Sequence, residues 1–243
     1  MEIFSSEGFY LLLRWFHFLA GITWIGILYY FNFVQTPYFA TELGGQARSP
    51  MVRGLVPNAM WWFRWGAMFT FLTGWTIILT KFAQAAPGTH GALLCSQYMT
   101  TILTGGLFGT LMWANVWFVI WPAQQKVIAN AENVAKGGQA DPTAAPAGAR
   151  SGLASRTNVL FSIPMLFFMG SASHFPSLMQ RLANLEGHLA LYWLAFAVIA
   201  GAIEYNALAG KTDQKIAKPP VGPVIHAGLG LTLVMYVVAS VLL

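Results

Sequence analysis

The chain has 243 residues, of which 56% are hydrophobic and only 9% are charged, and its formal net charge is +5. A soluble domain carries about a quarter of its residues as charged side chains, so this composition excludes an ordinary soluble domain. The single cysteine, Cys95, excludes an intrachain disulfide and a covalently attached c-type haem, which needs two cysteines. The basic residues lie between apolar runs instead of forming one patch, so no nucleic-acid partner is indicated.

Six apolar stretches are long enough to cross a bilayer, which takes about 20 residues in a helix. We therefore expect an all-α integral membrane protein, with lipid around it and a single membrane domain over residues 1–243. The first helix is expected to stop at Pro37, and the fourth is the shortest. The predicted helices cover residues 9–36, 61–82, 99–121, 157–173, 187–205 and 221–241.

Basic residues are concentrated in alternate predicted loops, whereas the opposite side has only Lys81 and Arg181 near its helix ends. Cytoplasmic loops of membrane proteins are enriched in Lys and Arg, so these loops are predicted to be cytoplasmic. Both termini are then periplasmic, in a bacterial inner membrane. Residues 137–152, rich in Gly, Ala and Pro, are predicted to form a flexible cytoplasmic loop. The basic loop residues are Arg48, Arg53, Lys126, Lys136, Arg150, Arg156, Lys211, Lys215 and Lys218.

The first predicted helix contains two ionisable residues, Arg14 and His17, inside its apolar run. They are three residues apart and share a helix face. Ionisable groups in a membrane helix usually face the bundle interior and mark function. An alternative is that Arg14 reaches outward to the interface and His17 is a packing residue. The same face, which we expect to point into the bundle, continues through Gly21, Trp24, Leu28, Asn32 and Gln35.

Four histidines are candidate ligands. His174 ends the fourth predicted helix and His188 begins the fifth, so both could meet His17 at the outer side, whereas His226 lies apart near the inner start of the sixth. Neutral imidazole binds haem iron, and a helix bundle can hold a porphyrin between two histidines. We predict one or two b-type haems, with iron bound by His17 and His188 or, alternatively, His174. His226 would serve a second haem or a quinone site. Zinc or copper bound by clustered histidines is the rival interpretation.

Five stretches resemble the membrane domain of the bacterial membrane-bound urate oxidase (urate hydroxylase) family. The first stretch also resembles, more distantly, the membrane-bound protoporphyrinogen oxidase family, in which a histidine on such a helix binds haem b. The stretches are 14–35 (RWFHFLAGITWIGILYYFNFVQ), 62–67 (WFRWGA), 115–122 (NVWFVIWP), 155–158 (SRTN) and 162–174 (SIPMLFFMGSASH).

The resemblance to urate oxidase implies a membrane oxidoreductase of purine degradation that oxidises urate and passes electrons to cytochrome c. Family members often carry a cytochrome c domain after the last helix, and the chain stops at Leu243 without one. We therefore expect a separate periplasmic cytochrome c or a quinone as electron acceptor. Arg14 would bind the substrate anion or a haem propionate. The alternative is a non-catalytic accessory or scaffold subunit of a larger respiratory or photosynthetic membrane complex.

Overall fold

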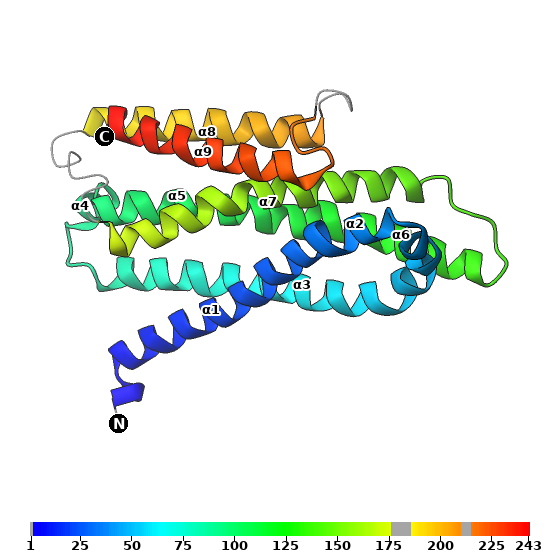
Figure 1. Cartoon of the computed structure of the whole chain (residues 1–243). Coiled ribbons are helices and arrows are strands. Elements are labelled where there is room, and N and C mark those ends of the chain that lie inside the picture. The colour runs from blue at the N-terminus through cyan, green and yellow to red at the C-terminus, as the bar shows by residue number, and fades with distance from the viewer. Residues whose placement is uncertain (1, 176–185, 210–214) are drawn as a thin grey trace. The chain divides into compact units, whose positions relative to one another are not determined.

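The computed structural model describes residues 2–175, 186–209 and 215–243, and every regular element in these ranges is a helix (Figure 1). Six of its helical segments are long and apolar enough to cross a membrane, which confirms the predicted multi-pass all-α architecture. These segments are Ser6–Phe39, Glu42–Gln84, Gln97–Ala135, Ala144–His174, His188–Leu208 and Val221–Leu242.

Most of the helices are longer than the apolar runs from which they were predicted. Hydropathy marks only the part of a helix that lies in hydrocarbon, and helical hydrogen bonding continues into the flanking polar residues. The elements are η1 (Glu2–Phe4), α1 (Ser6–Tyr29), η2 (Tyr30–Gln35), α2 (Thr36–Phe39), α3 (Glu42–Gln84), α4 (His90–Leu94), α5 (Gln97–Ala114), η3 (Asn115–Ile120), α6 (Trp121–Ala135), α7 (Ala144–His174), α8 (Glu186–Leu208) and α9 (Val221–Leu242).

Two prolines follow wide π-helical turns. The prediction that Pro37 stops the first helix is wrong, because the helix continues through η2 into α2 and ends at Phe39. Pro122 stands in the same position after η3. Proline lacks an N–H, and its ring crowds the carbonyl one turn earlier. A π turn is wider than an α turn, so it gives the ring the space that a regular helix would deny it.

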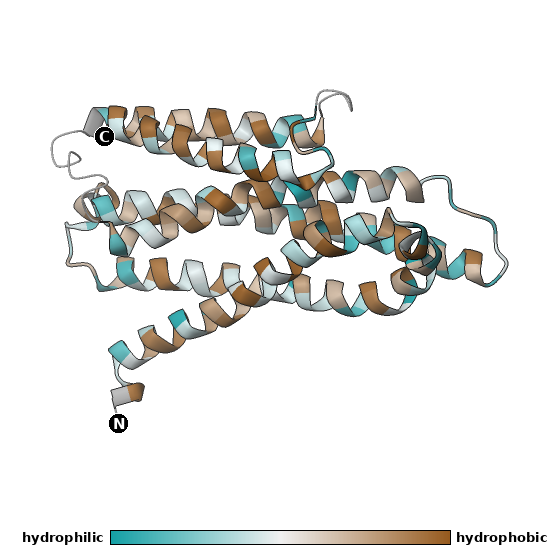
Figure 2. Cartoon of the chain, viewed as in Figure 1, coloured by the Kyte–Doolittle hydropathy of each residue, from teal (hydrophilic) through white to brown (hydrophobic). Residues whose placement is uncertain are grey.

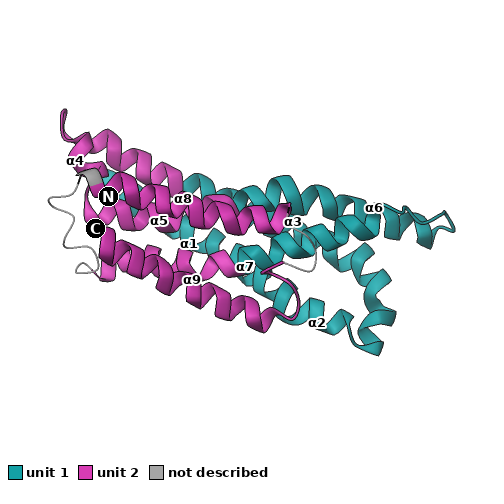
Figure 3. Cartoon of the chain, turned by 90° about the horizontal axis from the view of Figure 1, so that it is seen from above, with its two compact units in different colours: residues 1–73, 113–159 teal, residues 74–112, 160–243 magenta. Residues whose placement is uncertain are grey.

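The chain divides into two compact units (Figure 3). Unit 1 comprises Met1–Thr73 and Trp113–Val159, and unit 2 comprises Gly74–Met112 and Leu160–Leu243. Helices α3, α5 and α7 therefore contribute residues to both units. The expectation of a single membrane domain stays a prediction.

In unit 1, α1 packs against α3 at a close backbone approach. A Cβ on Gly66 would lie 3.1 Å from the backbone nitrogen of Trp24 and 3.3 Å from the carbonyl oxygen of Ala20. Trp24 and Leu28 are buried, as is Asn32 one turn later. The predicted inward face of the first helix is therefore confirmed from Trp24 to Asn32.

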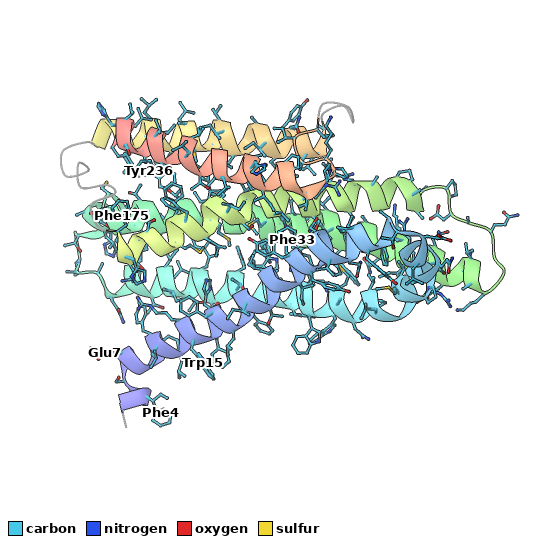
Figure 4. The ribbon with its side chains drawn as sticks, in the orientation of Figure 1. Phe4, Glu7, Trp15, Phe33, Phe175 and Tyr236 are labelled. Atoms are coloured by element: carbon cyan, nitrogen blue, oxygen red, sulfur yellow. The ribbon has the colours of Figure 1, made fainter. Side chains whose placement is uncertain are left out.

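The start of α1 departs from that expectation, because Arg14 is exposed. Its neighbour Trp15 is also 53% exposed, and Phe33 near the other end of the span is 38% exposed (Figure 4). The first turns of α1 have little cover within unit 1, so residues on several sides of the helix remain accessible there. Brown, hydrophobic residues recur along all the long helices, as lipid-facing surfaces require (Figure 2).

In unit 2, close contacts at glycines and a buried hydrogen bond join neighbouring helices. Gly105 of α5 lies against α7, where a Cβ would come within 2.9 Å of the carbonyl oxygen of Met165. Gly228 of α9 lies equally close to the carbonyl oxygen of Leu160 on α7. The hydroxyl groups of Thr104 and Tyr192 are 2.7 Å apart and connect α5 to α8. Small residues at such contacts allow membrane helices to approach closely.

The predicted flexible loop at residues 137–152 is shorter than expected. Helix α7 begins at Ala144, so residues 144–152 are helical. Alanine, the strongest helix former, recurs through this stretch and favours a helix over a loop. The remaining turn is tied down where the Asp141 backbone N–H donates to Asn130 Oδ1 at 2.6 Å. Hydrogen bonds from the Thr143 backbone N–H and hydroxyl lower the pKa of Asp141. The stabilisation from this carboxylate is present at neutral pH and is lost as the pH falls through that lowered pKa.

Glycine contacts in unit 2 give a paired prediction. Gly105→Ala and Gly228→Ala should each lower the stability of the protein in detergent by about 1–3 kcal/mol, because the new methyl group meets backbone and side-chain atoms of α7. Gly106→Ala and Gly230→Ala are the matched controls, because a Cβ at either position meets nothing within 4 Å. Thermal unfolding midpoints measure the difference. Equal midpoints within each pair would contradict the packing described above.

Candidate functional site

The residues singled out by the sequence fall into both units. Arg14 and His17 belong to unit 1, whereas His174, His188 and His226 belong to unit 2, where all three are exposed. The proposed pairing of His17 with His188 or His174 therefore stays a prediction. Among the described residues, no group of three or more His, Cys, Asp or Glu side chains is placed so that it could hold a metal ion. The zinc or copper alternative also stays a prediction.

His17 has a defined hydrogen-bond partner on α3. Its Nδ1 lies 3.1 Å from the hydroxyl oxygen of Thr73. That hydroxyl donates its hydrogen to the carbonyl oxygen of Phe69 at 2.6 Å, with the carbonyl of Thr70 at 3.2 Å. Because the hydroxyl has one hydrogen, it accepts from the imidazole, and we assign the proton of His17 to Nδ1. Nε2 then carries the lone pair with which an imidazole binds iron.

A second polar cluster lies on one face of α7 in unit 1. Ser151, Ser155 and Asn158 follow one another at helical spacing, and each is hydrogen-bonded to a different segment. The first π turn, the second π turn and α6 are thereby all tied to α7. The three bonds run from Asn32 Nδ2 to Ser155 Oγ at 2.8 Å, from Asn115 Nδ2 to Asn158 Oδ1 at 3.0 Å, and from Gln124 Nε2 to Ser151 Oγ at 2.8 Å.

Both π turns therefore present an asparagine to α7. Asn32 donates its second hydrogen to the carbonyl of Leu28, four residues earlier, so both hydrogens of its amide nitrogen are used. Asn32 and Asn115 are 5% and 2% exposed. A buried amide without partners is costly in hydrocarbon, so these bonds are needed for the polar side chains to be tolerated there. Single π turns inside α-helices occur frequently at functional sites.

A cleft of about 900 Å³ opens beside this cluster, entirely within unit 1. Its volume lies within the range of roughly 300–1,000 Å³ typical of small-molecule sites. Its walls come from the π turn η2, α2, the first half of α3, α6 and the start of α7. The polar and charged residues that line it are Asn32, Gln35, Thr36, Arg48, Ser49, Gln124, Asn130, Ser151, Ser155 and Arg156.

The charge of the cleft is positive. Arg48 and Arg156 line it, and no acidic side chain does so among the described residues. The guanidinium of Arg156 lies against Gly152, one turn earlier on α7, where a Cβ would be 3.3 Å from Nη1. Arg48 lies 6.0 Å from the ring centre of Phe39, another lining residue.

Gln35 adds an unsatisfied acceptor to the same cleft. Its Oε1 is buried and accepts no hydrogen bond from any described residue. Buried acceptors are normally paired, and an exception calls for an explanation such as a ligand, an ion or water. The cleft thus offers positive charge and an acceptor in need of an N–H donor.

A third arginine, Arg64 on α3, is held between indole rings. Its guanidinium carbon lies 3.7 Å from the ring centre of Trp121 and 5.4 Å from that of Trp117. Cation–π contact with tryptophan stabilises a guanidinium that is removed from water. Other aromatic rings lie next to this group. The ring centre of Trp65 on α3 is 5.7 Å from that of Trp117 on η3 and 5.9 Å from that of Phe69 on α3.

Sequence reasoning from titratable groups overlooked this cluster and its cleft. Asn32, Arg64, Asn115 and Arg156 all lie in the stretches that carried the family resemblance, yet none was selected as a functional residue. The available signal was the presence of amide and guanidinium groups inside or next to apolar runs. Arginine in a membrane helix, like histidine, usually marks function.

Comparison with protein families identifies the chain's relatives. The model of the urate oxidase N-terminal family matches residues 91–235, more than half of the chain. The chain belongs to this family. The predicted resemblance is thus confirmed, and the match covers the third, fourth and fifth candidate spans and most of the sixth. Comparisons with curated proteins and with solved structures gave no match.

The Asn115–Asn158 hydrogen bond can be tested by a double-mutant cycle. Asn115→Leu and Asn158→Leu should each destabilise the protein, because each leaves the other amide without this partner in an apolar interior. The double variant should lose less stability than the sum of the two single variants, by about 0.6–1.7 kcal/mol. Unfolding of the purified protein in detergent measures all four forms, and strict additivity would show that the pair contributes no coupling.

Proposed function

We propose that this membrane protein is a haem-b-dependent oxidoreductase that oxidises urate or a related small anion. Its electrons would pass to a separate periplasmic cytochrome c or a quinone. The observation that carries the proposal is the match to the urate oxidase N-terminal family over residues 91–235. The six apolar helices support the membrane location, for which we propose the bacterial inner membrane.

His17 is the residue that we propose to bind the haem iron. With the proton on Nδ1 and that nitrogen bonded to Thr73, Nε2 is free to act as an axial ligand. Haem and metal-binding histidines usually donate their other ring N–H to a fixed acceptor, which sets the ring orientation. The Thr73 hydroxyl is such an acceptor for His17, so the His17 imidazole is chemically suited to bind haem iron. When bound, haem b would supply a one-electron redox centre.

The remaining ligands are proposed from the sequence. His188, with His174 as the alternative, would supply the second axial nitrogen, and His226 would serve a second haem or a quinone site. Arg14 lies one turn before His17 on α1 and would pair with a haem propionate or with a substrate anion. In this arrangement α1 would hold the haem through His17 and offer the Arg14 guanidinium to a carboxylate.

An absorption spectrum tests the proposal. The protein, purified after growth with ample iron and reduced with dithionite, should show b-type haem bands. His17→Ala should lose most of them, whereas His90→Ala is the matched control, because His90 lies in the short helix α4 and stacks on Phe82. Absence of haem from the unaltered protein would sink the electron-transfer proposal.

Thr73 gives a finer test of how His17 is held. Thr73→Val removes the acceptor for Nδ1 and should weaken haem retention about 10–100-fold, with a shift in the reduced spectrum or midpoint potential. Thr80→Val on the same helix is the control, because its hydroxyl bonds only the Thr76 carbonyl among the contacts described. Identical spectra and retention for the two variants would remove Thr73 from the proposal.

Substrate use is measured separately. Urate should reduce the haem and support turnover with added cytochrome c. Haem that stays unreduced by urate, in a protein that co-purifies with a larger complex, would favour the accessory-subunit alternative over an enzyme.

A further inference from the structure

The cleft in unit 1 combines three properties that together restrict what it can bind. The first is charge, because Arg48 and Arg156 line it and none of its described lining residues is acidic. Two cationic groups without a carboxylate between them favour an anion, and a guanidinium can form two parallel hydrogen bonds to oxygen atoms of a ligand.

The second property is the mixture of hydrogen-bonding groups. Gln35 Oε1 is a buried acceptor without a donor among the described residues. The hydroxyl of Ser155 accepts from Asn32, so its own hydrogen is available for another acceptor, and Ser151 stands in the same relation to Gln124. A ligand that satisfies all of these groups needs both a hydrogen-bond donor, such as a ring N–H, and carbonyl or oxyanion acceptors. Sulfate has no hydrogen to donate to Gln35, and hydrogen phosphate can donate only through an O–H.

The third property is the apolar part of the wall. Phe31 and Phe39 line the cleft with partly exposed rings, and the buried Phe63 supports Phe31 at 5.7 Å between ring centres, nearly perpendicular. Flat aromatic ligands pack well against such ring faces and edges. A small hydrated anion would gain nothing from these surfaces.

We infer that this cleft binds a small, flat, singly charged heterocycle that carries both ring N–H and carbonyl groups, with Arg48 and Arg156 on its oxygen atoms and Gln35 on an N–H. The urate anion has this chemistry, and its use as the probe rests on the proposed function. Urate bound in this cleft would lie away from Arg14, at the end of the first span where η2 and α2 lie beside α7. By the predicted topology, the cleft opens toward the cytoplasm.

The test is equilibrium binding of urate to the full chain in lipid nanodiscs, with haem absorbance recorded on the same samples. Arg156→Gln should weaken urate binding at least tenfold, and Arg156→Lys should recover part of it because the positive charge is retained. Arg150→Gln is the matched control, because Arg150 is an exposed residue of the same helix that does not line the cleft. Gln35→Leu should weaken urate binding without changing the net charge.

Two further probes separate the three properties. Inorganic phosphate is an anion like urate but lacks the ring and N–H groups, and hypoxanthine is a flat heterocycle without the charge. Both should compete with urate at least tenfold more weakly. Equal competition by phosphate would overturn the heterocycle assignment, and equal competition by hypoxanthine would overturn the role of the arginines.

The outcome is interpretable even if Arg156→Gln does not fold, because Arg48→Gln alters an exposed lining residue and should weaken urate binding in the same direction. Urate binding that is unchanged in the Arg48, Arg156 and Gln35 variants would overturn the inference while leaving a haem protein intact. Loss of binding in these variants with no haem in any sample would uphold the cleft and sink the proposed redox function.

Discussion

The hydrogen bonding of buried side chains to α7 is the constraint on which unit 1 depends. In hydrocarbon there is no water to satisfy an amide or a hydroxyl, so leaving one without a partner is costly. Ser151, Ser155 and Asn158 provide these partners to α6 and to the two π turns. The same face of α7 therefore fixes the rotation of its neighbours and positions one wall of the cleft.

The π turns connect this constraint to the prolines. Each turn ends two residues before a proline, and each carries the asparagine that reaches α7. Ending the first span at Pro37 would leave Phe39, which lines the cleft, outside the helix. Local widening of the helix thus preserves a continuous span and brings Gln35 and the residues after it to the site.

The spans and the inward face of α1 could be predicted from the sequence because both follow from local periodicity. Trp24, Leu28 and Asn32 recur at helical spacing, and the structure buries all three. The cleft could not be predicted in this way, because its residues come from segments as distant as Gln35 and Arg156. Each of these looks like an isolated polar residue until the fold brings them together. The prediction that Arg14 faces the interior is wrong for a related reason. Helical spacing shows which residues share a face with Arg14, but it does not show whether a neighbouring helix covers that face.

The continuity of the first span has an energetic consequence. Asn32 follows His17 by 15 residues, which corresponds to roughly 22 Å along a helix. A continuous helical segment therefore joins the proposed haem ligand to the cleft. An electron that leaves a substrate in the cleft for iron at His17 would move a large part of the way across the bilayer. Transfer of one charge across the whole membrane is worth about 2.3 kcal/mol per 100 mV. On the two proposals together, turnover in energised cells would respond to the membrane potential, whereas turnover in detergent would not.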